Sequence, residues 1–217
     1  MLATPALADV YVGGDSLGVG VGWAGKAPSV ADESVRIKSK LPLNQIAKVP
    51  KGSTLFMSLG TNDAVGGVLN VEDSVSAIIT AAADRDIKLV WLGPPCVFKT
   101  WDDDAKALDG VLAGLMPSSP SVTYVSMRSD DLCTKSVRAK DGVHFTMKGY
   151  RLMWERALAA SGGSVDVPPD APVSTSKKPK AAVTVALAPI PMPVPAYRRG
   201  GLAFGAPFPM PIPAFRR

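Results

Sequence analysis

The sequence predicts an α/β fold, a three-layer α/β/α sandwich around a central parallel sheet of about five strands. Short apolar stretches of strand type alternate along the chain with longer stretches in which apolar residues recur at helical spacing. This alternation is typical of parallel strands joined by helices that cover both faces of the sheet. It extends from residue 9 to about residue 161, a length that suits one domain.

Three strands and two helices are expected in the first part of this domain. Val10–Val12 is a short apolar strand, and a helix follows over residues 16–27, where several glycines suit a tightly packed turn. Val35–Lys38 is a candidate second strand because its apolar residues alternate. Leu43–Val49 is a short helix that a proline ends. Ser53–Leu59 has the composition of a buried central strand.

The second part of the domain continues the alternation. Glu72–Ala83 has apolar residues at helical spacing and acidic residues in its first turn, where they interact favourably with the helix dipole. Ile87–Gly93 is a strand that two prolines end, and Asp102–Leu115 is a helix that begins with acidic residues. Val122–Met127 is the last strand, and Thr146–Ala160 closes the domain as a helix with one apolar side.

Charge and proline content divide the chain near residue 162. The formal net charge is +5, and residues 162–217 account for all of it, with seven basic and two acidic side chains. The preceding part is balanced and lacks the basic face that a nucleic-acid-binding domain needs. We expect residues 162–217 to form a disordered, Pro-rich basic tail. This tail either contacts a polyanionic polymer or a Pro-recognising partner, or only tethers and solubilises the domain.

The N-terminus favours export. Residues 1–8 end in the pattern Ala6-x-Ala8, the small-residue pattern that signal peptidases cut. We therefore expect a remnant of a signal peptide and a periplasmic or extracellular protein. The alternative is a plain lead-in to the first strand of a cytoplasmic protein. No run of 18 or more apolar residues occurs, so the sequence predicts no transmembrane segment.

Cys96 and Cys133 are the only cysteines in the chain. Each follows a predicted strand, and in an exported protein an even pair favours a disulfide, whereas two separate buried thiols are the alternative. A bridge would stabilise the fold by about 3–4 kcal/mol through loop entropy. With one histidine and two cysteines, we expect no structural zinc site, and no cofactor.

Ser16 is the candidate nucleophile. It follows the first strand in Gly14-Asp15-Ser16-Leu17-Gly18 and opens a helix, whose N-terminus places backbone N–H groups beside the serine oxygen. The same residues match the Gly-x-Ser-x-Gly nucleophile elbow of α/β-hydrolases. That fold needs several strands before its nucleophile, and only one fits here. A purely structural glycine–serine turn is the other alternative.

His144, the only histidine, lies three residues after Asp141. At this spacing the two side chains can share one side of a loop or first helical turn, so that the carboxylate holds the imidazole in the tautomer that a general base needs. Taken alone, His144 would more readily be a surface side chain at a helix start.

Asn62 follows the central strand in Gly60-Thr61-Asn62-Asp63. At the end of a buried strand, its amide can point at the oxygen that becomes negative in a tetrahedral intermediate, an interaction worth about 3–4 kcal/mol. A simple turn after the strand is the alternative.

The order of these blocks resembles that of the SGNH (GDSL-type) hydrolase family. The matching residues are Gly14-Asp15-Ser16-Leu17, Gly60-Thr61-Asn62-Asp63 and Asp141-Gly142-Val143-His144, followed by Phe145-Thr146 and Gly149-Tyr150. The resemblance covers residues 9–160 and none of the tail. It implies a flavodoxin-like fold in which Ser16 is the nucleophile, His144 the general base and then acid, and Asp141 the residue that orients His144.

The chain departs from the family at its second block, where a glycine usually supplies a backbone N–H. Residues 35–42 contain no glycine. The resemblance therefore implies an oxyanion hole made by the N–H of Ser16, the amide of Asn62, and the backbone N–H of Ser39 or Lys40. A side chain at this point narrows the approach to Ser16.

The resemblance implies a serine esterase that hydrolyses O-acyl esters, O-acetyl esters above all, through an acyl-serine intermediate. The expected substrates are acetylated polysaccharides or small esters, with no nucleic acid partner. Two alternatives remain: an O-acyltransferase with the same triad, and an inactive module of the same fold whose Pro-rich tail is the working part.

Overall fold

The computed structural model describes residues 9–116 and 121–163. The expectations for the first eight residues and for the tail from residue 164 onward lie outside these described residues. The unit described here falls within Met1–Ala171.

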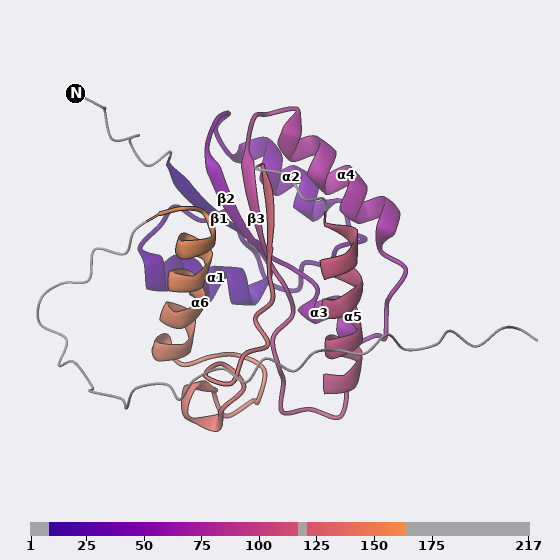
Figure 1. Ribbon diagram of the computed structural model, residues 1–217, viewed down its shortest axis with the longest axis vertical. Helices are drawn as coiled ribbons and strands as arrows, with labels where there is room; N and C mark the ends of the chain where they lie inside the picture. The colour runs from indigo at the N-terminus through magenta and orange to yellow at the C-terminus, as the bar shows by residue number, and fades with distance from the viewer. Residues whose placement is uncertain (1–8, 117–120, 164–217) are drawn as a thin grey trace, which may run out of the picture. The chain divides into compact units, whose positions relative to one another are not determined.

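The described chain contains one parallel sheet, as the sequence predicts. Its strands are β1 (Val10–Gly14), β2 (Thr54–Ser58), β3 (Lys88–Leu92) and β4 (Val122–Val125), and they lie side by side in that order. All three neighbouring pairs are parallel, so every strand points its carboxyl end to the same edge (Figure 1). β2 is buried throughout, which agrees with its prediction as a central strand.

The expected strand over Val35–Lys38 is wrong. The segment beside β1 is instead residues 28–32, where the N–H of Val12 donates to Pro28, that of Val30 to Val12, and that of Asp32 to Gly14, at 2.8–3.1 Å. These bonds occupy the sheet edge without forming a full strand. The described sheet therefore has four strands, and its fifth position holds this irregular segment.

The alternation of Val35 and Ile37 with polar residues has a cause other than strand formation. Both side chains are fully buried, but in the core between the sheet and its helices rather than in a strand. The N–H of Ile37 donates to a carboxylate oxygen of Asp63 at 3.0 Å, so a side chain satisfies this backbone in place of a neighbouring strand. Alternation of apolar residues alone does not distinguish the two situations.

Helices cover both faces of the sheet and complete the three layers. One face carries α2 (Leu41–Lys48), α4 (Glu72–Ala83) and α5 (Asp102–Leu115), with the single turn α3 (Thr61–Ala64) after β2. The opposite face carries α1 (Ser16–Gly25) and α6 (Met147–Ala160), which pack against each other (Figure 1).

Two glycines of α1 allow this close packing. A Cβ atom at Gly20 would lie 2.2 Å from the ring of Tyr150, and one at Gly25 would lie 2.3 Å from the ring of Trp154. Both distances are far below van der Waals contact. The glycines that weaken α1 as a helix are therefore required where aromatic side chains of α6 lie on its surface.

Within the described residues, no helix is both long enough and apolar enough to cross a membrane.

Candidate active site

The candidate site lies at the edge of the sheet where the strands end. Ser16 is the first residue of α1, directly after β1, and Asn62 lies in α3, directly after β2. Asp141 and His144 belong to the long segment between β4 and α6. Because all strands run parallel, loops that follow different strands meet at the same edge.

The structure brings the three predicted triad side chains together. His144 Nε2 lies 2.9 Å from Ser16 Oγ, across 128 residues of sequence. On the other side of the ring, His144 Nδ1 lies 2.6 Å from Asp141 Oδ2. The side chains of His144 and Asp141 are 41% and 48% exposed, so the site is open to solvent. This is the arrangement that nucleophile, base and orienting carboxylate need.

Asp141 also shapes the loop that carries His144. Its Oδ1 accepts the backbone N–H groups of Val143 and His144, both at 2.9 Å. Gly142 adopts φ +73° between them, a conformation that favours glycine. Partial burial raises the pKa of Asp141, but hydrogen bonds from the His144 ring and from these two N–H groups outweigh it and lower the pKa to about 2. The carboxylate is therefore ionised at neutral pH.

Arg138 also binds the loop that carries His144, and the sequence did not single out this arginine as a site residue. Its guanidinium donates to the carbonyl of Val143 at 2.7 Å, to that of Leu132 at 3.3 Å, and to that of Cys96. Its Cζ also lies 3.5 Å from the centre of the Phe145 ring. Burial lowers the pKa of Arg138 to about 10, which leaves it charged at neutral pH. Nothing in the local sequence distinguishes it from a surface arginine.

Cys96 and Cys133 form a disulfide, the first of the two alternatives that the sequence left open. Their Cα atoms are 5.3 Å apart, and the bridge joins the segment after β3 to the segment after β4. Two of the carbonyls that Arg138 binds belong to Cys96 and to Leu132, the residue before Cys133. The disulfide and Arg138 thus both connect the segment after β3 to the segment between β4 and α6.

The predicted oxyanion donors differ in whether their N–H groups are already hydrogen-bonded. One N–H of the Asn62 amide donates to the carbonyl of Val35 at 3.1 Å, which fixes the side chain and leaves its second N–H for another acceptor. The N–H of Ser39 donates to the carbonyl of Arg36 at 3.1 Å within a local turn, which does not favour the predicted role of Ser39. In the described chain the N–H of Lys40 has no such acceptor, so Lys40 remains the backbone candidate.

Asp63 is a second residue whose role the sequence did not reveal. It is buried, and its carboxylate accepts the N–H of Ile37 at 3.0 Å. Burial raises its pKa, against the hydrogen bond from Ile37 and the charge of Arg36. Asp63 therefore anchors the glycine-free segment to the turn that carries Asn62.

Gly14 permits the close approach of the first two strands behind Ser16. It adopts φ +107°, and a Cβ at this position would lie 1.9 Å from the carbonyl oxygen of Ser58. Gln45 of α2 binds both its polar groups, accepting its N–H at 2.7 Å and donating to its carbonyl at 2.9 Å. This pairing fixes the backbone that leads into Ser16.

Asp15 lies directly before Ser16 and is fully buried. Its Oδ1 caps α1 by accepting the N–H of Leu17 at 3.0 Å and also lies 3.4 Å from Ser58 Oγ. In the described part of the chain, Oδ2 has no hydrogen-bond partner. Burial raises the pKa of Asp15 from 3.8 to about 7. The carboxyl is therefore stable as a neutral acid at mildly acidic pH.

The Asp15→Asn substitution is expected to flatten the dependence of stability on pH between about pH 4 and 7. In this range the folded wild type holds a proton on Asp15 that the unfolded chain has lost, so its stability falls as pH rises through 7. The loss of stability over this range is at most about 4 kcal/mol. Asparagine does not titrate, so the variant should not show this loss. Urea unfolding at several pH values measures the difference. Exposed Asp84→Asn is the matched control, and equal slopes for wild type and Asp15→Asn would contradict the prediction.

Comparison with known proteins rests on structure. No family model matches the chain, and no curated protein matches it in sequence. Among solved structures, a lipolytic G-D-S-L family protein from Desulfitobacterium hafniense superimposes with a TM-score of 0.55 at 16% identity, over 70% of this chain and 98% of its own. This chain therefore has the SGNH hydrolase fold.

Two further structures with this fold have named activities. The C-terminal catalytic domain of peptidoglycan O-acetyltransferase A from Streptococcus pneumoniae gives a TM-score of 0.54 at 20% identity, over 72% of this chain and 96% of its own. The acetylxylan esterase Axe2 from Geobacillus stearothermophilus gives a TM-score of 0.57 at 11% identity, over 75% of this chain and 98% of its own. At these identities the similarity establishes the SGNH fold.

Proposed function

We propose that the protein is a serine esterase that removes O-acyl groups, O-acetyl above all, from carbohydrates or small esters through an acyl-serine intermediate. The observation that carries this proposal is the continuous hydrogen-bond chain from Ser16 through His144 to Asp141. Each member has the neighbour that its role requires.

In the first half of the reaction, Ser16 Oγ attacks the ester carbonyl carbon while His144 Nε2 takes the hydroxyl proton. Asp141 stabilises the imidazolium through Nδ1–H. The N–H groups of Ser16, Asn62 and Lys40 stabilise the negative oxygen of the tetrahedral intermediate. The intermediate expels the alcohol, which receives the proton from His144, and the acyl group remains on Ser16.

In the second half, water takes the place of the alcohol. His144 accepts a proton from the water as it attacks the acyl carbon, and then returns that proton to Ser16 Oγ as the acid departs. Because His144 and Asp141 are about half exposed, water has direct access to the acyl-serine.

Two observations support a carbohydrate ester as the substrate. The open site suits a group that projects from a large chain, since a polymer cannot enter an enclosed pocket. In addition, two of the structures with this fold are an acetylxylan esterase and a peptidoglycan O-acetyltransferase. The second of these also motivates the alternative function, in which a sugar hydroxyl replaces water as the acceptor.

We further propose that the protein is exported to the periplasm or the extracellular space. A disulfide between the only two cysteines supports this location, because disulfides persist in oxidising compartments.

Serine-directed labelling tests the proposed function. Full-length protein treated with phenylmethylsulfonyl fluoride is expected to carry one sulfonyl group on the peptide that contains Ser16, and to lose the release of acetate from acetylated xylan in parallel. His144→Ala should prevent labelling because the hydroxyl is no longer activated. Acetate release that continues with Ser16 fully modified would refute the proposal. Acetylated product formed with a glycan acceptor present would instead identify a transferase.

A further inference from the structure

A cavity of about 370 Å³ lies against the loop that carries Asp141. Its walls come from the segment after β3 and from the segment between β4 and α6, the two segments that the disulfide joins. The wall residues that matter here are Phe98, Lys99, Lys135, Arg138, Lys140 and Asp141. None of them except Asp141 has a part in the proposed ester chemistry itself.

The cavity is positively charged. Three lysines and Arg138 line it, and Asp141 is its one acidic wall residue. The carboxylate of Asp141 is already bound to His144 and to two backbone N–H groups. The three ion pairs found among the described residues involve none of these lysines. Four positive charges therefore gather here in a part of the chain whose overall charge is balanced.

Two further features suit an anionic ligand with a sugar body. Arg138, one of the lining residues, is a buried cation, and its Nε–H has no acceptor in the described structure. Phe98 is 42% exposed at the wall, which offers an apolar surface beside the charges. Lys99 and Lys140 come from different segments of the chain and line the same cavity.

We propose that this cavity is a subsite for a negatively charged sugar residue, one that carries a carboxylate or a phosphate, in a glycan whose ester reacts at Ser16. Asp141 belongs both to the cavity wall and to the triad, so an occupant of the cavity lies beside Asp141, with the His144 ring between Asp141 and Ser16. The place of this subsite in catalysis rests on the proposed function, whereas the binding of an anionic sugar does not.

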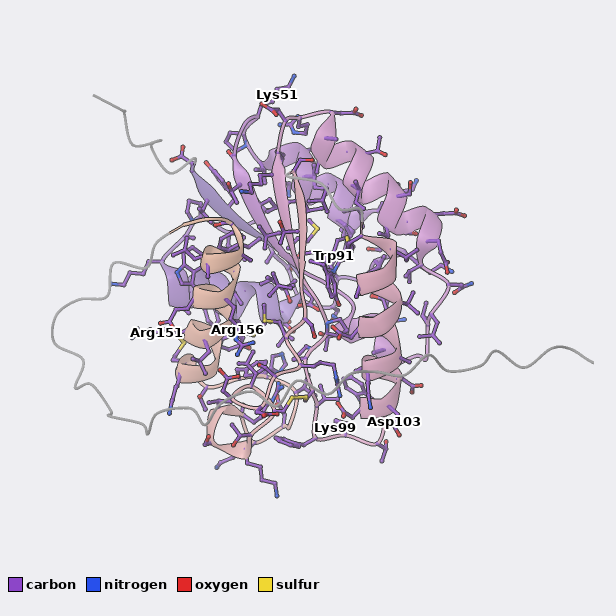
Figure 2. All side chains as sticks on the ribbon, in the orientation of Figure 1. Lys51, Trp91, Lys99, Asp103, Arg151 and Arg156 are labelled. Carbon is purple, nitrogen blue, oxygen red and sulfur yellow. A yellow bond between two sulfur atoms is a disulfide. The ribbon has the colours of Figure 1, made fainter. Side chains whose placement is uncertain are left out.

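The lysines at the opposite end of the sheet provide a matched control. Figure 2 shows Lys99 near the disulfide, whereas Lys51 projects at the other end of the domain. Lys48 is the last residue of α2, three positions before Lys51, and both are exposed. The pairs Lys99→Gln/Lys140→Gln and Lys48→Gln/Lys51→Gln remove the same charge and leave the basic residues of the C-terminal part untouched.

Binding measured without turnover tests the subsite. Full-length Ser16→Ala protein, alone and combined with each lysine pair, is titrated with trigalacturonate, glucose 6-phosphate and neutral xylotriose in a calorimeter at low ionic strength. The cavity pair is expected to weaken the binding of the anionic ligands by about 3- to 10-fold, and the control pair to leave it unchanged. Neither pair should alter the binding of xylotriose. The difference should shrink as salt is added.

The outcomes separate this proposal from the esterase proposal. A loss confined to trigalacturonate identifies a carboxylate, and a loss confined to glucose 6-phosphate identifies a phosphate. Equal weakening by the two lysine pairs would overturn the subsite, because it would show diffuse attraction to net charge. Equal affinity for xylotriose and trigalacturonate would overturn it as well. If wild type releases no acetate from any ester while the cavity pair still weakens anion binding, the esterase proposal fails and the subsite stands.

Discussion

Ser16→Ala is expected to lower kcat/KM for p-nitrophenyl acetate by about 10⁴-fold or more. In the proposed mechanism the Ser16 hydroxyl, which lies 2.9 Å from His144 Nε2, forms the covalent bond to the acyl carbon. In serine hydrolases the triad members act as one unit, so loss of the nucleophile removes nearly the whole contribution of the triad. Initial rates with substrate below KM give this ratio directly.

A surface serine serves as the control for this substitution. Ser76 is exposed on α4, and Ser76→Ala should retain wild-type kcat/KM. Both variants should keep the circular dichroism spectrum and the urea midpoint of the wild type, because Ser16 Oγ is hydrogen-bonded to a half-exposed side chain, that of His144. More than about 1% of wild-type activity in Ser16→Ala would contradict the assignment of the nucleophile.

Asp141→Asn is expected to lower kcat by about 10²- to 10⁴-fold with little change in KM. An asparagine keeps an oxygen for the N–H groups of Val143 and His144, so the loop can keep its shape. The amide cannot stabilise the imidazolium, and its N–H facing His144 Nδ1 would favour the wrong tautomer. Steady-state kinetics on p-nitrophenyl acetate separate kcat from KM.

Asp103→Asn is the matched control, since Asp103 is an exposed acid in the first turn of α5. It should leave kcat within about twofold of wild type. If Asp141→Asn also stayed within a few-fold of wild type, the orienting role would belong to another group, and the triad would have to be redrawn.

The sequence predicted those parts of the molecule that local chemistry determines. Apolar strands and amphipathic helices follow from their periodicity, and the helix bounds differ from expectation by only a few residues. The positions of Ser16, Asp141 and His144 were predicted from the order of short blocks along the chain. Parallel strands then explain why residues 128 positions apart meet at one edge.

The errors arose where long-range contacts replace local ones. Apolar residues alternate over Val35–Lys38 as they do in a strand. The backbone N–H of Ile37, however, donates to the carboxylate of Asp63, which lies 26 residues further along the chain and outside any local stretch of sequence. Ser39 differs, because its N–H donates to the carbonyl of Arg36 three residues earlier, in a local turn that was not predicted. Arg138 binds carbonyls 42 and 6 residues before it and 5 after it, and such a set has no sequence signature.

The packing of α1 against α6 has a consequence for the chemistry. α1 begins with Ser16, and α6 begins three residues after His144, so the spacing of these two helices sets the gap between nucleophile and base. That spacing requires a residue without a Cβ atom at Gly20, because the ring of Tyr150 lies directly against the backbone there. The distance between Ser16 Oγ and His144 Nε2 thus depends on an aromatic ring that packs against α1 more than a full helical turn from Ser16.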